Sequence, residues 1–219
     1  MGCLILFKKV NKTALIFKKS KNMSVYTKVG DYTVTQLLNK VKGLSSFKGI
    51  PTGYWILGIR SQEDTYDVFD DKFYIFKGET LIDTLTGTTN PGSYGLMNFS
   101  LWNKKGVAVV KSDEWYYGVW SRGLHKGKSP ALKQTGGFKI IRDGNKNKKS
   151  GDSGEPAWEY GIGINFHTNT HNYSSRIWNW IVGGWSTGCQ VTNDVEKFVK
   201  FLDYTKGQNL FTYCLISEF

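Results

Sequence analysis

Residues Tyr54–Ile59 read YWILGI, and runs of this kind decide the fold class of the chain. The run is short, apolar and rich in the aromatic and β-branched side chains that are favoured in strands. Clusters of Gly, Asn and Asp, which are typical of turns, separate it from similar runs downstream. These runs are Lys72–Phe76 (KFYIF), Val107–Val110 (VAVV), Trp115–Trp120 (WYYGVW), Tyr160–Phe166 (YGIGINF) and Leu210–Ile216 (LFTYCLI). The pattern predicts one mostly β domain.

Two segments have helical rather than strand periodicity. In Val34–Val41 (VTQLLNKV) the apolar residues recur at i, i+3, i+4 and i+7, which places them on one face of a short helix. Asp194–Tyr204 (DVEKFVKFLDY) has a similar pattern, with Asn193 or Asp194 as the N-cap. Its expected buried face consists of Val195, Phe198, Val199 and Leu202. We therefore expect a short helix before the strands and one helix near the C-terminus.

The basic charge is concentrated at the N-terminus. The 219 residues include 29 Lys and Arg and 18 Asp and Glu, for a net charge of +11. Residues 1–23 contain six lysines and no acid, so they hold +6 of this charge. We expect residues 1–23 to be a disordered basic extension, with a membrane-surface or nucleic-acid arm as the alternative. Residues 24–53 then form the N-terminal helix and its connector, and residues 54–219 form the main domain.

The remaining charge does not indicate a nucleic-acid partner. Outside residues 1–23 the net charge is only +5, and the sequence contains no helix-turn-helix, zinc-finger or RNP pattern. The chain has no run of about 18 apolar residues, so no transmembrane segment is predicted. The apolar pieces of the N-terminus are too short for a signal-peptide core. We expect no nucleic-acid partner and no membrane span.

Cys189 lies in an unusual setting for a structural cysteine. It belongs to Gly183–Val191 (GGWSTGCQV), where small residues leave the thiol uncrowded and let backbone approach a ligand. A thiol is mostly protonated at neutral pH, so a nucleophilic role requires a neighbouring base. His167 ends an apolar strand 22 residues upstream, a spacing that suits two adjacent strands joined by a long excursion. Amides around Gly188 and Cys189 would then hold an oxyanion.

Two other interpretations compete with this Cys–His pair. A lone cysteine is usually a small buried hydrophobic residue, which is our interpretation of Cys214 within LFTYCLI. His167, His171 and Cys189 could instead supply three zinc ligands. However, no Glu lies between the two histidines, and Thr168–Thr170 (TNT) disfavours a helix. We rank the metal site below the pair and expect neither a metal nor another cofactor.

These residues resemble the L,D-transpeptidase catalytic-domain (YkuD-type) family, in which a strand-borne His is followed by Ser-x-Gly-Cys. The two elements here are Ile164–His167 (INFH) and Ser186–Cys189 (STGC). Lys72–Gly78 resembles the opening hairpin of the family, and Thr84–Tyr94 resembles its TG…P-G-x-Y/F element. Four elements in the same order make the resemblance more specific than the Cys motif alone. It covers residues 54–216.

A particular branch of the family is indicated by three further elements. They are Gly123–Gly127 (GLHKG), Arg142–Asn145 (RDGN) and Trp185–Gln190 (WSTGCQ), and together they resemble a branch common among phage and prophage proteins. Because the chain has no evident signal peptide, a phage-type lysin fits better than a secreted cross-linking enzyme. We expect synthesis in the cytoplasm and action at the bacterial cell wall or periplasm, with delivery by a phage as one route.

The resemblance implies a β-rich, L,D-transpeptidase-like sandwich and a catalytic domain over residues 54–219. Its substrate would be the stem peptides of peptidoglycan. Carried over residue by residue, Cys189 is the nucleophile and His167 the base, Ser186 matches the motif Ser, and the backbone of Gly188 helps to shape the oxyanion site. The acyl-enzyme passes to an amine in transpeptidation or to water in hydrolysis. The motif does not separate these outcomes, and the oligomeric state is left open.

The sequence departs from the family pattern at three positions. Val191, Thr187 and Thr168 stand where members often have Arg, His and Gly, respectively. Loss of the Arg leaves open which residue holds a substrate carboxylate, and the candidates are Lys133, Arg122 and Arg176.

A rival base and the walls of the substrate groove complete the predicted site. The spacing between His171 and the motif Ser also occurs in the family, so His171 is the rival base. We prefer His167 because it ends the apolar strand. The expected substrate-binding residues are His125, which lies in a Gly-flanked loop, Tyr94, His171 and Trp185.

The alternative function is a non-catalytic module that binds the cell wall or its glycans. Exposed aromatic side chains suit stacking on sugars. The candidates are Trp115, Tyr116, Tyr117, Trp178 and Trp180. An intact Cys–His pair argues against binding alone.

Overall fold

A computed structural model describes residues 28–149, 154–174 and 180–219, and the expected extension over residues 1–23 lies outside them. The described chain is mostly β, with a helix before the strands and another near the C-terminus, as predicted. Its helices are α1 (Val34–Lys42), α2 (Ser93–Asn98), the 3-10 turn η1 (Phe99–Leu101) and α3 (Val195–Tyr204). Its strands are β1 (Tyr54–Arg60), β2 (Asp71–Lys77), β3 (Thr80–Thr88), β4 (Val107–Val110), β5 (Glu114–His125), β6 (Ser129–Gln134), β7 (Phe138–Asp143), β8 (Ala157–Glu159), β9 (Phe166–Thr168), β10 (Gln190–Thr192) and β11 (Leu210–Ser217).

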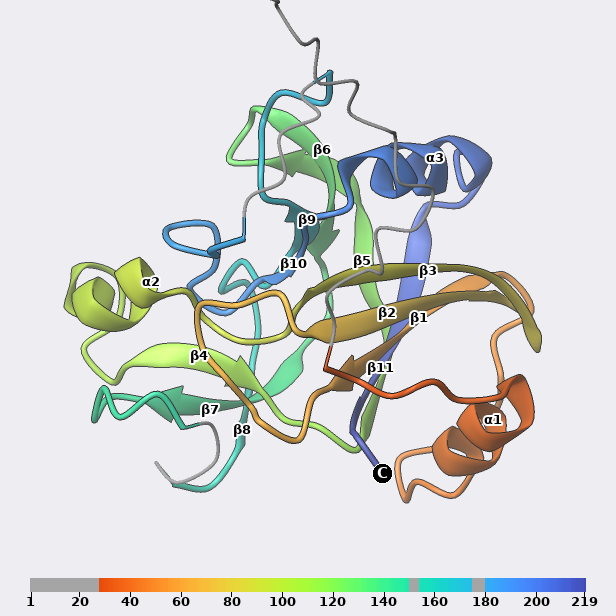
Figure 1. Cartoon of the computed structure of the whole chain (residues 1–219), viewed down its shortest axis with the longest axis horizontal. Coiled ribbons are helices and arrows are strands. Elements are labelled where there is room, and N and C mark those ends of the chain that lie inside the picture. Colours follow the sequence, from red (N-terminus) through yellow and green to blue (C-terminus); the bar gives the residue numbers. More distant parts are fainter. Residues whose placement is uncertain (1–27, 150–153, 175–179) are drawn as a thin grey trace, which may run out of the picture.

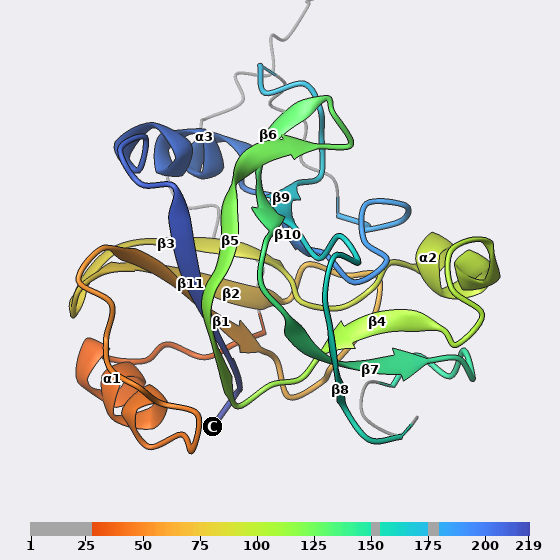
Figure 2. The ribbon, with the colours of Figure 1, turned by 180° about the vertical axis from the view of Figure 1, so that it is seen from behind.

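Eight of these strands close into a barrel. Their order around the barrel is β1-β11-β5-β6-β9-β10-β3-β2, and β1 completes the ring by pairing with β2 on one side and β11 on the other. The remaining strands form a small antiparallel sheet, β4-β7-β8. Figures 1 and 2 show this sheet and α2 at one side of the barrel and α1 at the other.

The wall of the barrel contacts apolar side chains on both faces, as β1 illustrates. Ile56 belongs to the main core, whereas Trp55 and Leu57 belong to a second cluster that includes the buried face of α1. Because side chains alternate along a strand, neighbouring residues reach the two clusters. The helix itself begins at a capping box, in which the side chains of Thr33 and Gln36 each accept a hydrogen bond from the other residue's backbone N–H. The prediction of this helix is confirmed.

The helix near the C-terminus is also present, but its buried face differs from the predicted one. The carboxylate of Asp194 caps α3 by accepting a hydrogen bond from the amide of Lys197. Val199 is 38% exposed, whereas Phe201 is fully buried, so the prediction of Val199 on the buried face was wrong. The Phe201 ring packs against Phe166 and Phe211 of the barrel. Burial of this large aromatic surface outweighs burial of a valine and sets the rotation of the helix.

The predicted strand Tyr160–Phe166 is not formed. Strand β8 ends at Glu159, and β9 begins only at Phe166. Between them Gly161 and Gly163 have φ values of 66° and 84°, which lie outside the range of an extended strand. The segment is therefore a loop, and it contributes to the wall of the candidate site.

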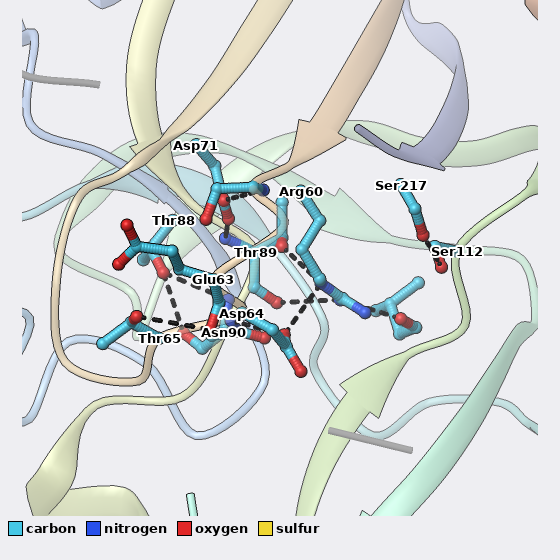
Figure 3. Close-up of polar contacts among 12 residues, drawn as sticks. Arg60, Glu63, Asp64, Thr65, Asp71, Thr88, Thr89, Asn90, Ser112 and Ser217 are labelled. Atoms are coloured by element: carbon cyan, nitrogen blue, oxygen red, sulfur yellow. Dashed lines mark hydrogen bonds and ion pairs between the residues drawn. The ribbon is translucent and has the colours of Figure 1, made fainter. Parts of the chain in front are cut away.

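A buried arginine connects the barrel to the small sheet (Figure 3). Arg60, at the end of β1, donates from Nε to Oγ1 of Thr89 at 2.8 Å and from Nη2 to the carbonyl of Val110 at 2.9 Å. Its guanidinium lies 3.7 Å from the Asp64 carboxylate. Charge-assisted bonds of this kind are favourable when buried and fully partnered, so Arg60 fixes where β4 meets the barrel.

No helix within residues 28–149, 154–174 or 180–219 has the length and apolar character needed to cross a membrane.

Candidate active site

Cys189 and His167 lie on neighbouring segments of the barrel. Strands β9 and β10 are parallel neighbours in which His167 pairs with Val191, and Cys189 immediately precedes β10. The thiol lines a cavity of about 180 Å³ beside the small sheet. Residues that contribute to its wall include Phe99, Trp102, Arg142, Ile164 and Thr187. The register thus places the two predicted residues on adjacent elements, and Cys189 borders a space that a ligand can enter.

The turn before Cys189 is shaped by Ser186 and Gly188. The Ser186 hydroxyl accepts a hydrogen bond from the amide of Gly188 at 3.1 Å and donates one to the carbonyl of Cys189 at 2.9 Å. Gly188 has a φ of 136°, and a Cβ at this position would lie 2.7 Å from the carbonyl oxygen of Ala108. Only glycine fits there without strain. Because Ser186 already engages the Gly188 amide, the Cys189 amide is the more available donor for an oxyanion.

A second histidine joins the pair. The rings of His125, at the end of β5, and His167 stack with centroids 3.7 Å apart and planes 22° apart. One ring nitrogen from each histidine and the Cys189 sulfur all lie within 4.8 Å of one another. The Nδ1 of His167 donates to the carbonyl of Thr168 at 2.7 Å, which leaves Nε2 as its basic nitrogen. His125 is therefore part of the thiol's surroundings rather than of a loop.

Burial keeps all three groups neutral. It raises the pKa of the Cys189 thiol to about 11. It lowers the pKa of His167 to about 3, and the neighbouring His125 contributes to the same shift. The pKa of His125 falls to about 4, through burial and then through the positive charge of Lys126. At neutral pH the site thus holds a thiol beside two uncharged imidazoles, rather than a thiolate beside an imidazolium.

The rival base, His171, lies outside this cluster. Its side chain is exposed, and its Nδ1 lies 2.9 Å from the Ser129 hydroxyl. The edge of its ring meets Trp185 at a centroid distance of 4.9 Å, and its centroid lies 6.1 Å from that of His125. The structure thus brings His125, and not His171, together with His167 and Cys189. His171 and Trp185 border the site at its outer edge.

Asn165 is a site residue that was not predicted from the sequence. Its amide N–H donates to the Cys189 sulfur at 3.5 Å, and its carbonyl accepts from Gln190 at 2.9 Å. Its side-chain Oδ1 accepts from the amide of Gln134 at 3.1 Å, and its Nδ2 lies 3.3 Å from Nδ1 of His125. The available signal was its position inside the INFH element, two residues before His167.

The predicted Tyr94 lies on α2 and is 53% exposed. Its ring meets that of Trp102 edge-on, at a centroid distance of 6.0 Å, and Trp102 lines the Cys189 cavity. Gly95 explains why α2 lies so close to the site, because a Cβ there would fall 2.7 Å from the carbonyl oxygen of Ser186. Trp102 was not predicted, since no motif marked it.

The cation at the Cys189 cavity is not one of the three that the sequence suggested. Arg122 is bound to the carbonyls of Leu202 and Gln208, and with Lys133 it lines a hollow separate from the Cys189 cavity. Arg176 lies outside the described residues. Arg142 lines the cavity itself, where it pairs with Glu159. Sequence alone could not select it, because Arg142 and Cys189 are 47 residues apart.

The donor set of the site is suited to a metal as well as to acyl transfer. Two imidazoles and one thiol are ligands typical of zinc. Within the described parts of the chain, His125, His167 and Cys189 form the cluster with this geometry. The predicted third ligand, His171, does not belong to it.

Comparisons with known proteins identified no relative of this chain. The chain matches no protein-family model, no curated protein and no solved structure.

Proposed function

We propose that the protein is a cysteine-dependent acyl-transfer enzyme that acts on the stem peptides of peptidoglycan. The observation that carries the proposal is the buried Cys189 thiol within 4.8 Å of imidazole nitrogens, at the wall of a cavity. A nucleophile adjacent to a base whose second nitrogen is fixed by a hydrogen bond is the arrangement that acyl transfer requires. The choice of substrate rests on the resemblance of the INFH and STGC elements to the L,D-transpeptidase family.

The chemistry follows from the neutral state of the site. His167 Nε2 takes the thiol proton as the Cys189 sulfur attacks the peptide carbonyl carbon, and the amide of Cys189 donates to the oxyanion. Collapse of the tetrahedral intermediate breaks the C–N bond, and the leaving amine takes the proton from His167. A thioester remains. Water or an amine then attacks this thioester and returns the proton to sulfur, which completes hydrolysis or transpeptidation.

Hydrolysis by a phage-type lysin at the bacterial cell wall is the form of this activity that we favour. Tyr94, Trp102 and His125 would contact the substrate, while Ser186 and Gly188 hold the turn that presents the thiol. Arg142 lines the same cavity and pairs with Glu159. An acidic group of the peptide would replace Glu159 as the partner of its guanidinium.

The alternative is a wall-binding module without catalysis. Two of the aromatic residues expected to serve it, Trp115 and Tyr116, are buried, and Trp178 lies outside the described residues. Trp180 is 57% exposed, and Trp102 at the Cys189 cavity is 56% exposed. Exposed aromatic surface at the cavity is equally useful to an enzyme that must hold glycan strands.

Mass spectrometry of muropeptides after incubation with the full chain tests the proposal. Wild type should release or join stem peptides, and Cys189→Ala should not. The two proteins should unfold at the same temperature. EDTA should leave the activity intact. Pull-down on cell walls by both variants without any product would instead establish the binding module.

A further inference from the structure

Three buried side chains, of which Cys189 lines the cavity, combine the chemistry and the placement of metal ligands. His125 ends β5, His167 lies in β9 and Cys189 precedes β10, so the three are held by separate strands. Their exposed fractions are 4%, 1% and 6%, and one potential ligand atom of each lies within 4.8 Å of the others. Such a group is already gathered before any ion arrives, which lowers the entropic cost of binding.

Two buried nitrogen atoms in this cluster have no hydrogen-bond partner. They are the Nε2 atoms of His125 and His167. The Nδ1 of His167 is bonded to the Thr168 carbonyl, and Nδ1 of His125 faces the Asn165 amide, so Nε2 is the nitrogen each ring has left. A buried polar atom without a hydrogen-bond partner destabilises the folded state. A cation bound by both nitrogens would supply the missing partner, once the proton of His125 has moved from Nε2 to Nδ1.

The ligand types select the class of ion. Imidazole and thiolate favour Zn²⁺ and related transition metals, whereas Mg²⁺ and Ca²⁺ prefer oxygen ligands. Three protein ligands leave one tetrahedral position, and Cys189 borders the cavity from which water or a substrate group would fill it.

We propose that His125 and His167, through their Nε2 atoms, and Cys189, through its sulfur, form a reversible Zn²⁺ site. An ion bound there occupies the sulfur and the basic nitrogen at once. It therefore blocks acyl transfer, a consequence that rests on the proposed function, whereas metal binding itself does not.

Asn165 sets how tightly the ion is held. When Nε2 of His125 binds a metal, its Nδ1 carries the proton and needs an acceptor. The neighbour of this nitrogen is Nδ2 of Asn165, itself a donor, because Oδ1 of the same side chain accepts from the Gln134 amide. The wild-type site should accordingly be weaker than one with a carboxylate at this position. Asn165→Asp supplies that carboxylate and should tighten binding about tenfold or more.

Cobalt titration of the full chain tests this site directly. After treatment with EDTA and its removal, wild type should bind one Co²⁺ per chain and develop thiolate-to-cobalt charge-transfer absorption, which Zn²⁺ then abolishes by displacement. Cys189→Ser should lack the band, and the matched control Cys214→Ser should keep it. His125→Gln and His167→Gln should each weaken binding about tenfold or more, whereas His171→Gln should leave it within about twofold.

Several outcomes would overturn the site. They are the absence of the band in wild type, its persistence in Cys189→Ser, unchanged affinity in a folded His125→Gln, and unchanged affinity in Asn165→Asp. Cleavage of muropeptides by the metal-free chain is measured in parallel. Cleavage without cobalt binding would remove only the metal site, and cobalt binding without cleavage would remove only the proposed function.

Discussion

Cys189 and Cys214 are both free and buried, yet different groups surround their thiols. Cys214 lies in the middle of β11, fully buried in the apolar cluster that includes Trp55 and the inner face of α1. Burial raises the pKa of its thiol well above the usual value, as it does at Cys189. Only Cys189 has imidazole nitrogens within 4.8 Å and a cavity beside it. Burial is therefore common to both thiols, and a base together with access distinguishes the candidate nucleophile.

Removal of each sulfur in turn should have the largest and most different effects. Cys189→Ala should lower muropeptide turnover by about 10³-fold or more, because no nucleophile remains. Cys214→Ala should keep turnover within about twofold and lower the free energy of unfolding by about 1 kcal/mol, through lost packing. Mass spectrometry and urea unfolding measure the two effects. Equal loss of turnover in both variants would show that the difference in surroundings has no catalytic meaning.

Removal of the base should have the next largest effect. His167→Ala should lower kcat/KM by about 10²- to 10⁴-fold, because the proposed base that takes the thiol proton is then missing. His171→Ala is the matched control and should change kcat/KM less than about threefold, since its ring is exposed and lies beside Ser129. The opposite pattern in steady-state kinetics would assign the base to His171.

Two hydroxyls, one in the turn before Cys189 and one bonded to the end of the Cys214 strand, offer a finer test. Ser186→Ala removes two hydrogen bonds of the turn before Cys189, so turnover should fall about tenfold and the free energy of unfolding by about 1–2 kcal/mol. Ser112→Ala removes the 2.8 Å contact to Ser217, the last residue of the Cys214 strand. It should leave turnover unchanged. A loss of stability without loss of turnover in Ser186→Ala would contradict a positioning role.

The smallest effect is expected at the rim of the cavity. Trp102→Ala should raise KM about three- to tenfold at constant kcat and stability, because this ring is 56% exposed and lines the Cys189 cavity. Trp158 is 49% exposed on β8 and contacts Tyr116, so Trp158→Ala is the matched exposed aromatic. Similar KM values for both variants would place the substrate elsewhere.

The local sequence pattern predicted correctly those elements whose structure depends on residues close together in the chain. The runs at Tyr54–Ile59 and Leu210–Ile216 form strands, Val34–Val41 lies within a helix, and Cys214 is buried as expected. The same reasoning failed at Tyr160–Phe166, where apolar residues alternate with glycines. There the positive φ values of Gly161 and Gly163 produce a loop, which hydropathy alone does not reveal.

The sites of long-range contact were not predictable in this way. His125 reaches His167 because β5 pairs with β6 and β6 pairs with β9, a register that no local pattern encodes. Arg142 and Trp102 reach the Cys189 cavity because the small sheet and the α2–η1 segment lie against the same end of the barrel. Asn165 gains its role from four simultaneous partners, Cys189, Gln134, His125 and Gln190, whereas the sequence showed only its position two residues before His167.

By itself, the sequence determined a mostly β chain flanked by two helices, and it singled out Cys189 and His167 by residue type and spacing. It could do so because strand and helix propensities and turn glycines act over a few residues. Only the tertiary structure decided that the barrel closes through β1 and β11, that His125 joins the thiol, and that Arg142 lines the same cavity. These contacts join residues far apart in the chain, and their energy comes from packing and register that exist only once the whole barrel has closed.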